Sequence, residues 1–105
     1  MPFFIFRGID GADGASIRAE VRDAHRAYIR VPAMGCRVVA GGPLVDDQGT
    51  AMFGTLLVLE AADRSAAEQF LRGDPYSKAK LFASTALDRW NWGLGNLVLT
   101  TATSG

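Results

Sequence analysis

The sequence predicts an α+β fold in which strands and helices follow the order β-α-β-β-α-β. An aromatic and β-branched run at residues 3–6 predicts the first strand, because such runs are typical of strands central in a sheet. Apolar residues recur at helical spacing over residues 16–31 and again in "DRSAAEQFLRG". The segment "AMFGTLLVLEA" contains the clearest strand, at about residues 52–60.

The first predicted helix ends before Pro32, which interrupts the helical pattern. Its predicted buried stripe consists of Ile17, Val21, Ala24, Tyr28 and Val31. Its predicted outer side carries Arg18, Arg22, Arg26 and Arg30. His25 falls at the edge of the buried stripe, and Arg22, three residues earlier, can face the same space.

A predicted hairpin joins a short strand at residues 36–40 to the strand at residues 52–60. The segment "VDDQGT" supplies the turn, where Asp46 and Asp47 are typical turn residues. The residues expected to end the short strand are Gly41, Gly42 and Pro43. These residues either only terminate the strand or also let a ligand approach the backbone, because glycine adds no side chain there.

The second half of the chain completes the predicted sheet. Asp74 and Pro75 follow the second helix directly and can cap and start a new helical turn. The segment "ASTALDRWNWGLGNLVLT" supplies a further strand, and residues 96–105 are expected to form a separate strand or an arm. With right-handed crossovers, this order gives an antiparallel sheet with the helices on one face, the ferredoxin-like arrangement. The other face would need a second subunit to cover its apolar residues, so we expect a homodimer.

Length and composition limit the classes of protein. We expect residues 1–105 to form one domain. Eleven basic residues balance eleven acidic ones, so nothing favours nucleic acid or an anionic membrane as a partner. The single cysteine, Cys36, excludes an internal disulfide and fits a reducing cytoplasm. The N-terminal "MPFFIFRGID" is typical of a strand rather than a signal peptide, and no apolar run approaches the length of a membrane helix.

His25, the only histidine, is the first candidate for chemistry, because an imidazole can accept and donate a proton near neutral pH. Such a histidine needs an orienting partner, usually a carboxylate. The acidic candidates are Asp46, Asp47 and Asp74. Each candidate also has a structural explanation: His25 as a half-exposed helix residue, the first two aspartates as turn residues and Asp74 as a helix cap.

Other motifs favour packing over chemistry. Trp90 and Trp92 share one face of a strand, where core or dimer-interface packing is expected, and Cys36 is expected to be buried and inert. One cysteine and one histidine cannot supply a thiolate or imidazole zinc site within one chain, so we expect no metal. "GLGN" is too short and wrongly placed for a dinucleotide loop, and no G-x-S-x-G pattern indicates a hydrolase. We therefore expect no cofactor.

Four motifs in this order resemble the YciI-like (YCII-related) family of small bacterial proteins: "VRDAHRAYI", "AGGPLVDDQG", "GDPYSKAKLF" and "RWNWGLG". The resemblance covers about residues 3–95. It implies a ferredoxin-like fold of the dimeric α+β barrel group, in agreement with the fold predicted from the residues.

The resemblance also implies a histidine-aspartate pair beside a pocket. The histidine falls on His25 and the aspartate on Asp74. The other recurrent positions of the family fall on Arg22, Pro43 and Tyr76. Thr55 stands where many relatives have serine, which keeps the hydroxyl but narrows the space.

Two functions follow as hypotheses. The first is an enzyme in which His25 and Asp74 perform cofactor-free acid/base chemistry on a small oxygenated, cyclic or aromatic compound. The reaction would be of isomerase, lyase or dehydrochlorinase type, with Arg22, Pro43, Thr55 and Tyr76 binding the substrate. The alternative is a dimeric module that binds a small molecule without converting it, or that serves a larger enzyme.

Overall fold

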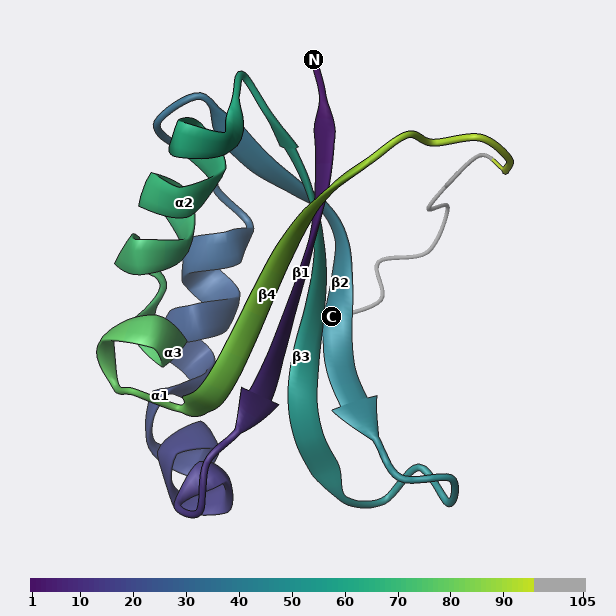
Figure 1. The fold of residues 1–105 in the computed structure, drawn as a ribbon. Helices are drawn as coiled ribbons and strands as arrows, with labels where there is room; N and C mark the ends of the chain where they lie inside the picture. Colours follow the sequence, from purple (N-terminus) through teal and green to yellow (C-terminus); the bar gives the residue numbers. More distant parts are fainter. Residues whose placement is uncertain (96–105) are drawn as a thin grey trace.

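The computed structural model describes residues 1–95 as one four-stranded sheet with the helices on one side (Figure 1). The elements are β1 (Phe3–Asp10), α1 (Gly14–Ile29), β2 (Cys36–Val45), β3 (Met52–Ala61), α2 (Arg64–Gly73), α3 (Pro75–Lys78) and β4 (Phe82–Trp90). The strand order is β2-β3-β1-β4, and every neighbouring pair is antiparallel. The predicted α+β, ferredoxin-like fold is confirmed.

The core lies between the sheet and the helices, because side chains alternate between the two faces of each strand. In β1, Phe4 and Phe6 are 3% and 4% exposed, and they pair with Leu59 and Leu57 of β3. Phe70 of α2 is fully buried against this layer. The core cluster consists of Phe4, Phe6, Ile29, Cys36, Leu57, Leu59, Ala61, Ala67, Phe70 and Leu71.

Helix α1 buries a different stripe from the one that its apolar residues predict. The buried residues are Gly14, Arg18, His25 and Ile29. Ala24 and Val31 are exposed. The placement of Arg18 on the outer side is wrong, since only 4% of this residue is exposed, and Arg22 and Arg26 are half-buried. Hydropathy alone missed this stripe because partners elsewhere in the chain compensate the burial of its polar groups.

The predicted end of β2 at Ala40 is wrong, because the strand continues through Pro43 to Val45. The strand order places β2 at the edge of the sheet. A proline is tolerated there, because its missing N–H group need not remove a hydrogen bond between strands. Gly41 and Pro43 pair with Leu57 and Thr55 of β3. The continued strand therefore brings Pro43 beside Thr55.

Within residues 1–95, no helix covers the second face of the sheet (Figure 1). Phe3 lies opposite Trp90 on this face, and the ring centroids of Trp90 and Trp92 are 5.2 Å apart. Both tryptophans also contact the Phe3 ring, although Trp92 lies beyond the end of β4 and neither tryptophan is in the core. The predicted packing at a dimer interface stays a prediction. The predicted strand or arm at residues 96–105 lies outside the described residues. No helix among residues 1–95 is long and apolar enough to span a bilayer.

Candidate active site

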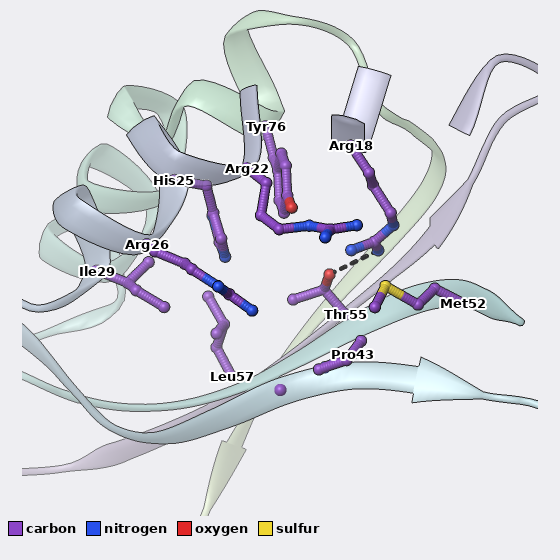
Figure 2. A pocket seen from close by; sticks show the side chains of 11 residues that line it. Arg18, Arg22, His25, Arg26, Ile29, Pro43, Met52, Thr55, Leu57 and Tyr76 are labelled. Carbon is purple, nitrogen blue, oxygen red and sulfur yellow. Dashed lines mark hydrogen bonds between the residues drawn. The ribbon is translucent and has the colours of Figure 1, made fainter. Parts of the chain in front are cut away.

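A pocket lies between α1 and the β2–β3 side of the sheet (Figure 2). Its walls are Arg18, Arg22, His25, Arg26, Ile29, Gly42, Pro43, Met52, Thr55, Leu57 and Tyr76. Five residues come from α1, five from β2 and β3, and Tyr76 comes from α3. The pocket thus assembles side chains from four elements that are distant in sequence.

His25 and Asp74 form a direct hydrogen bond inside the fold. The distance from His25 Nδ1 to Asp74 Oδ1 is 2.7 Å, and the two residues are 6% and 1% exposed. A carboxylate can only accept a hydrogen bond, so Nδ1 carries the hydrogen when the imidazole is neutral. The other ring nitrogen, Nε2, has no hydrogen-bond partner among residues 1–95. It is therefore free to exchange a proton with a molecule in the pocket.

The local structure around Asp74 explains how this pair is positioned. Asp74 follows α2 with an extended backbone and caps α3, where its Oδ1 also accepts a hydrogen bond from the Tyr76 backbone N–H at 2.9 Å. The Tyr28 hydroxyl donates to the Phe70 carbonyl at 2.8 Å and so ties α1 to the last turn of α2. The helix cap expected at Asp74 and its contact with His25 are thus both present.

Tyr76 packs its ring flat against the imidazole. The ring centroids of His25 and Tyr76 are 3.8 Å apart, with an angle of 15° between the planes. On the other side of Tyr76 lies Arg18, whose Cζ atom is 5.1 Å from the ring centroid. Figure 2 shows the three side chains in this order. The stacking fixes the plane of the imidazole, while the hydrogen bond to Asp74 fixes its rotation within that plane.

Arg18 forms a buried network that the sequence did not suggest. Its guanidinium donates to both oxygens of Asp10, to the Gly54 carbonyl at 2.7 Å and to Thr55 Oγ1 at 2.8 Å. Burial lowers the pKa of Arg18, but the ion pair with Asp10 and the nearby Tyr76 together outweigh burial, so the net shift is upward. Since a guanidinium only donates, the Thr55 hydroxyl keeps its own hydrogen for another acceptor, such as a ligand oxygen.

The remaining predicted site residues are also at the pocket. Arg22 and Pro43 both line it, Arg22 from α1 and Pro43 from the exposed edge strand. The structure thus brings together His25, Asp74, Arg22, Pro43, Thr55 and Tyr76. Sequence reasoning missed Arg18 and Arg26, although the series Arg18, Arg22, His25 and Ile29 has helical spacing and marks one face of α1. That spacing is the feature of the sequence that could have indicated which face of α1 is buried.

Asp46 and Cys36 have structural roles away from the pocket. The Asp46 side chain accepts hydrogen bonds from the Thr50 backbone and hydroxyl, and the backbone bond lowers its pKa. This is the turn role expected from the sequence. Cys36 is buried, and burial raises the pKa of its thiol to about 11, which makes the thiolate scarce at neutral pH. Among residues 1–95, no three His, Cys, Asp or Glu side chains gather as a metal site would require.

Comparison with known families now identifies the chain. The model of the YCII-related domain matches residues 1–91. The chain belongs to the YCII-related domain family. The family resemblance read from the four motifs is therefore confirmed. No curated protein matches this YCII-related chain significantly.

Solved structures show the same fold. The 5-chloro-2-hydroxyhydroquinone dehydrochlorinase from Burkholderia phenoliruptrix AC1100, in complex with 2,5-dihydroxybenzoquinone, is 31% identical, with a TM-score of 0.72 over 87% of this chain and 95% of that chain. PA3566 from Pseudomonas aeruginosa is 16% identical, with a TM-score of 0.52 over 85% and 91%. SnoaB, a cofactor-independent oxygenase from Streptomyces nogalater, is 15% identical, with a TM-score of 0.51 over 92% and 96%. The last two share the fold alone with this YCII-related protein.

Proposed function

We propose that this chain is a small-molecule enzyme that uses His25 and Asp74 for cofactor-free general acid/base chemistry. The observation that carries the proposal is the 2.7 Å hydrogen bond from His25 Nδ1 to Asp74 Oδ1, with Nε2 left unpaired at the pocket among the described residues. A positioned base with an oriented tautomer is what proton transfer requires. The similarity to a dehydrochlorinase that is crystallised with a ligand supports a small-molecule enzyme.

The proposed reaction begins when His25 Nε2 takes a proton from a C–H or O–H group of the substrate. The resulting imidazolium is stabilised by the negative charge of Asp74. In an isomerisation, the proton returns to a different atom of the same molecule. In an elimination, the electron pair of the broken bond forms a double bond and expels a leaving group such as chloride, so that one proton and one chloride are released.

The other predicted residues bind the substrate in this proposal. Thr55 donates its free hydroxyl hydrogen to a substrate oxygen, because Arg18 already donates to Thr55 Oγ1. Arg22 binds a carboxylate or enolate oxygen. Pro43 and Tyr76 provide apolar surface that favours a cyclic or aromatic compound. We also place the protein in the cytoplasm, because its single cysteine suits a reducing compartment.

Turnover by the His25→Asn variant tests the proposal. A panel of chlorinated and hydroxylated quinols, including 5-chloro-2-hydroxyhydroquinone, is followed by absorbance and chloride release. We expect the wild type to convert at least one compound and His25→Asn to lose about 10²-fold or more in kcat. Asp47→Asn, in the exposed turn, is the matched control and should keep full activity. Full activity in His25→Asn, at unchanged fold, would refute the assigned role.

One observation favours the alternative, a module that binds or interacts without catalysis. The pocket has a volume of about 30 Å³, enough for about two water molecules. A ring-sized substrate would therefore need the half-buried Arg22 and Arg26 side chains to move aside. If 2,5-dihydroxybenzoquinone raises the melting temperature but no compound of the panel is converted, the binding module is the better description.

We further propose that the chain is a homodimer that buries the uncovered face of the sheet. Apolar residues gather there: the half-buried Ile5 pairs with the buried Val58, and Phe3 pairs with Trp90, both half-buried. An apolar sheet face of this kind needs a second layer. Light scattering should give twice the monomer mass for the wild type and the monomer mass for Ile5→Glu. The control is Ala27→Glu on the exposed side of α1. A monomeric wild type would refute the dimer.

A further inference from the structure

Three arginines of α1 line one small pocket, and their charges are not all neutralised. Arg18, Arg22 and Arg26 follow one another at intervals of four residues and contribute three positive charges. The carboxylates that contact this group are Asp10, bound to Arg18, and Asp74, bound to His25. With a neutral imidazole, the cluster carries one net positive charge, although the whole chain carries none. The excess charge is therefore local to the pocket.

Arg18 does not account for this excess, because the Asp10 carboxylate balances its charge. Arg18 is 4% exposed and forms an ion pair with Asp10 as well as hydrogen bonds to Gly54 and Thr55. The bidentate ion pair with Asp10 balances its charge, so Arg18 adds no net positive charge to attract an anion. Arg18 is thus a structural residue that joins α1 to β1 and β3.

Arg22 and Arg26 differ from Arg18 in this respect. Neither guanidinium has an ion-pair partner among residues 1–95, and both side chains are half-buried at the pocket. Figure 2 shows both guanidinium groups reaching from α1 toward the centre of the pocket. Like charges four residues apart repel each other on a helix. Their placement is therefore unfavourable for the free protein and needs another explanation.

We propose that the pocket binds its ligand as an oxyanion, with Arg22 and Arg26 as the two anion-binding residues. This inference deepens the proposed function and rests on it. The ligand class is a small planar compound with a carboxylate, enolate or phenolate oxygen at one edge. An oxyanion that accepts hydrogen bonds from two guanidinium groups removes their mutual repulsion and compensates their partial burial. The same charges would stabilise the negative charge that grows on the substrate when His25 removes a proton.

The orientation of the ligand follows from the positions of these groups. His25 and Thr55 lie on opposite walls of the pocket, on α1 and β3, and the Arg22 guanidinium reaches into the same pocket (Figure 2). An oxyanion bound by Arg22 would therefore hold the ring between the imidazole and the Thr55 hydroxyl. Arg26, one helical turn beyond Arg22, would contact the same anion or a second oxygen.

Pairs of ligands with nearly the same shape, of which only one is negatively charged, test whether the pocket recognises the charge. The probes are benzoate with benzamide and salicylate with salicylamide, measured by calorimetry at low and at physiological salt. We expect at least one carboxylate to bind about 10-fold or more tightly than its amide, and binding to weaken as salt rises. Absence of binding by both carboxylates, or equal binding of carboxylate and amide, would overturn the proposal.

Variants of single arginines then test which residues bind the carboxylate. Arg22→Gln and Arg26→Gln should each weaken carboxylate binding about 10-fold or more while leaving amide binding unchanged. Arg30→Gln removes the same charge from an exposed side chain at the end of the same helix and should have no more than a twofold effect. Equal losses in all three variants would show a general field effect and refute the assignment.

A fourth variant separates this inference from the proposed function. His25→Asn should bind carboxylates within about threefold of the wild type while losing turnover. Carboxylate binding that depends on both arginines, together with full turnover in His25→Asn, would leave the anion site standing and refute only the catalytic role. Loss of turnover in His25→Asn with charge-independent binding would refute only the anion site.

Discussion

The Arg18 guanidinium donates from Nε and Nη2 to the two carboxylate oxygens of Asp10, at 2.7 and 2.9 Å. The side chains of this pair are only 4% and 8% exposed, so the helix α1 and the end of β1 share a buried ion pair. The same guanidinium reaches Gly54 and Thr55 on β3. One arginine thus holds α1, which lines the pocket, to β1 and β3.

Removal of Asp10 should therefore cost more stability than its position near a strand end suggests. Asp10→Ala leaves the Arg18 charge buried without its carboxylate, and such losses cost about 3–5 kcal/mol. The free energy of unfolding from urea denaturation measures the loss. Asp47→Ala, in the exposed turn, should stay within about 0.5 kcal/mol of the wild type. A loss below about 1 kcal/mol for Asp10→Ala would show that water replaces the carboxylate.

The tautomer of His25 can be measured without knowledge of the substrate. Because the chain has one histidine, long-range ¹H–¹⁵N spectra of the imidazole contain signals of one residue. We expect the neutral ring of the wild type to carry its hydrogen on Nδ1, bound to Asp74.

In Asp74→Asn, the side-chain amide can also donate to Nδ1, so the population with the hydrogen on Nε2 should increase. Turnover should fall about 10²–10⁴-fold, since Nε2 then lacks the lone pair that accepts the proton. Asp63→Asn, at the cap of α2, is a matched change of an aspartate cap and should leave the His25 spectrum unchanged. An Nε2–H ring in the wild type would contradict the assigned geometry.

Cys36 should make stability depend on pH in the alkaline range. Burial raises the pKa of the folded thiol from 9.0 to about 11, so the folded state disfavours the thiolate more than the unfolded chain does. The contribution of the protonated thiol to the free energy of unfolding is therefore fully present below about pH 9 and is lost as pH rises through about 11. The loss amounts to up to about 3 kcal/mol.

Urea denaturation at pH 7 and at pH 10.5 measures this effect. The loss of unfolding free energy between these pH values should be smaller in Cys36→Ala than in the wild type, because other titrating groups are common to both proteins. The native thiol should also resist alkylation at pH 8 until the protein unfolds. Rapid alkylation of the native protein would show that Cys36 is accessible.

Adjacent glycines in β2 should respond differently to alanine. A Cβ atom at Gly41 would lie 2.6 Å from Leu57 Cδ2 and 3.2 Å from the Leu56 carbonyl oxygen, whereas a Cβ atom at Gly42 would meet nothing within 4 Å. Because Leu57 is fully buried in the core, Gly41→Ala should cost about 1–3 kcal/mol of unfolding free energy. Gly42→Ala is the control and should cost less than about 1 kcal/mol. Equal effects in thermal denaturation would mean that Leu57 repacks freely.

The order of elements was predictable because strand and helix periodicities are local properties of the chain. The aromatic run of β1, the apolar run of β3 and the Asp-Pro start of α3 each reflect residues close in sequence. The inward face of α1 was not predictable in this way. Arg18 counts as a surface residue by hydropathy, and only Asp10 and the β3 acceptors make its burial favourable.

The sequence by itself determined the α+β order, the family and the residue types at the pocket, since these depend on periodicity and on short motifs. Only the tertiary structure decided that His25 meets Asp74 across 49 positions, and that Arg18 is neutralised while Arg22 and Arg26 are left without ion pairs among residues 1–95. The physical reason is that hydrogen bonds and ion pairs depend on distances of a few ångströms. Such distances between distant segments exist only after the sheet and helices have packed.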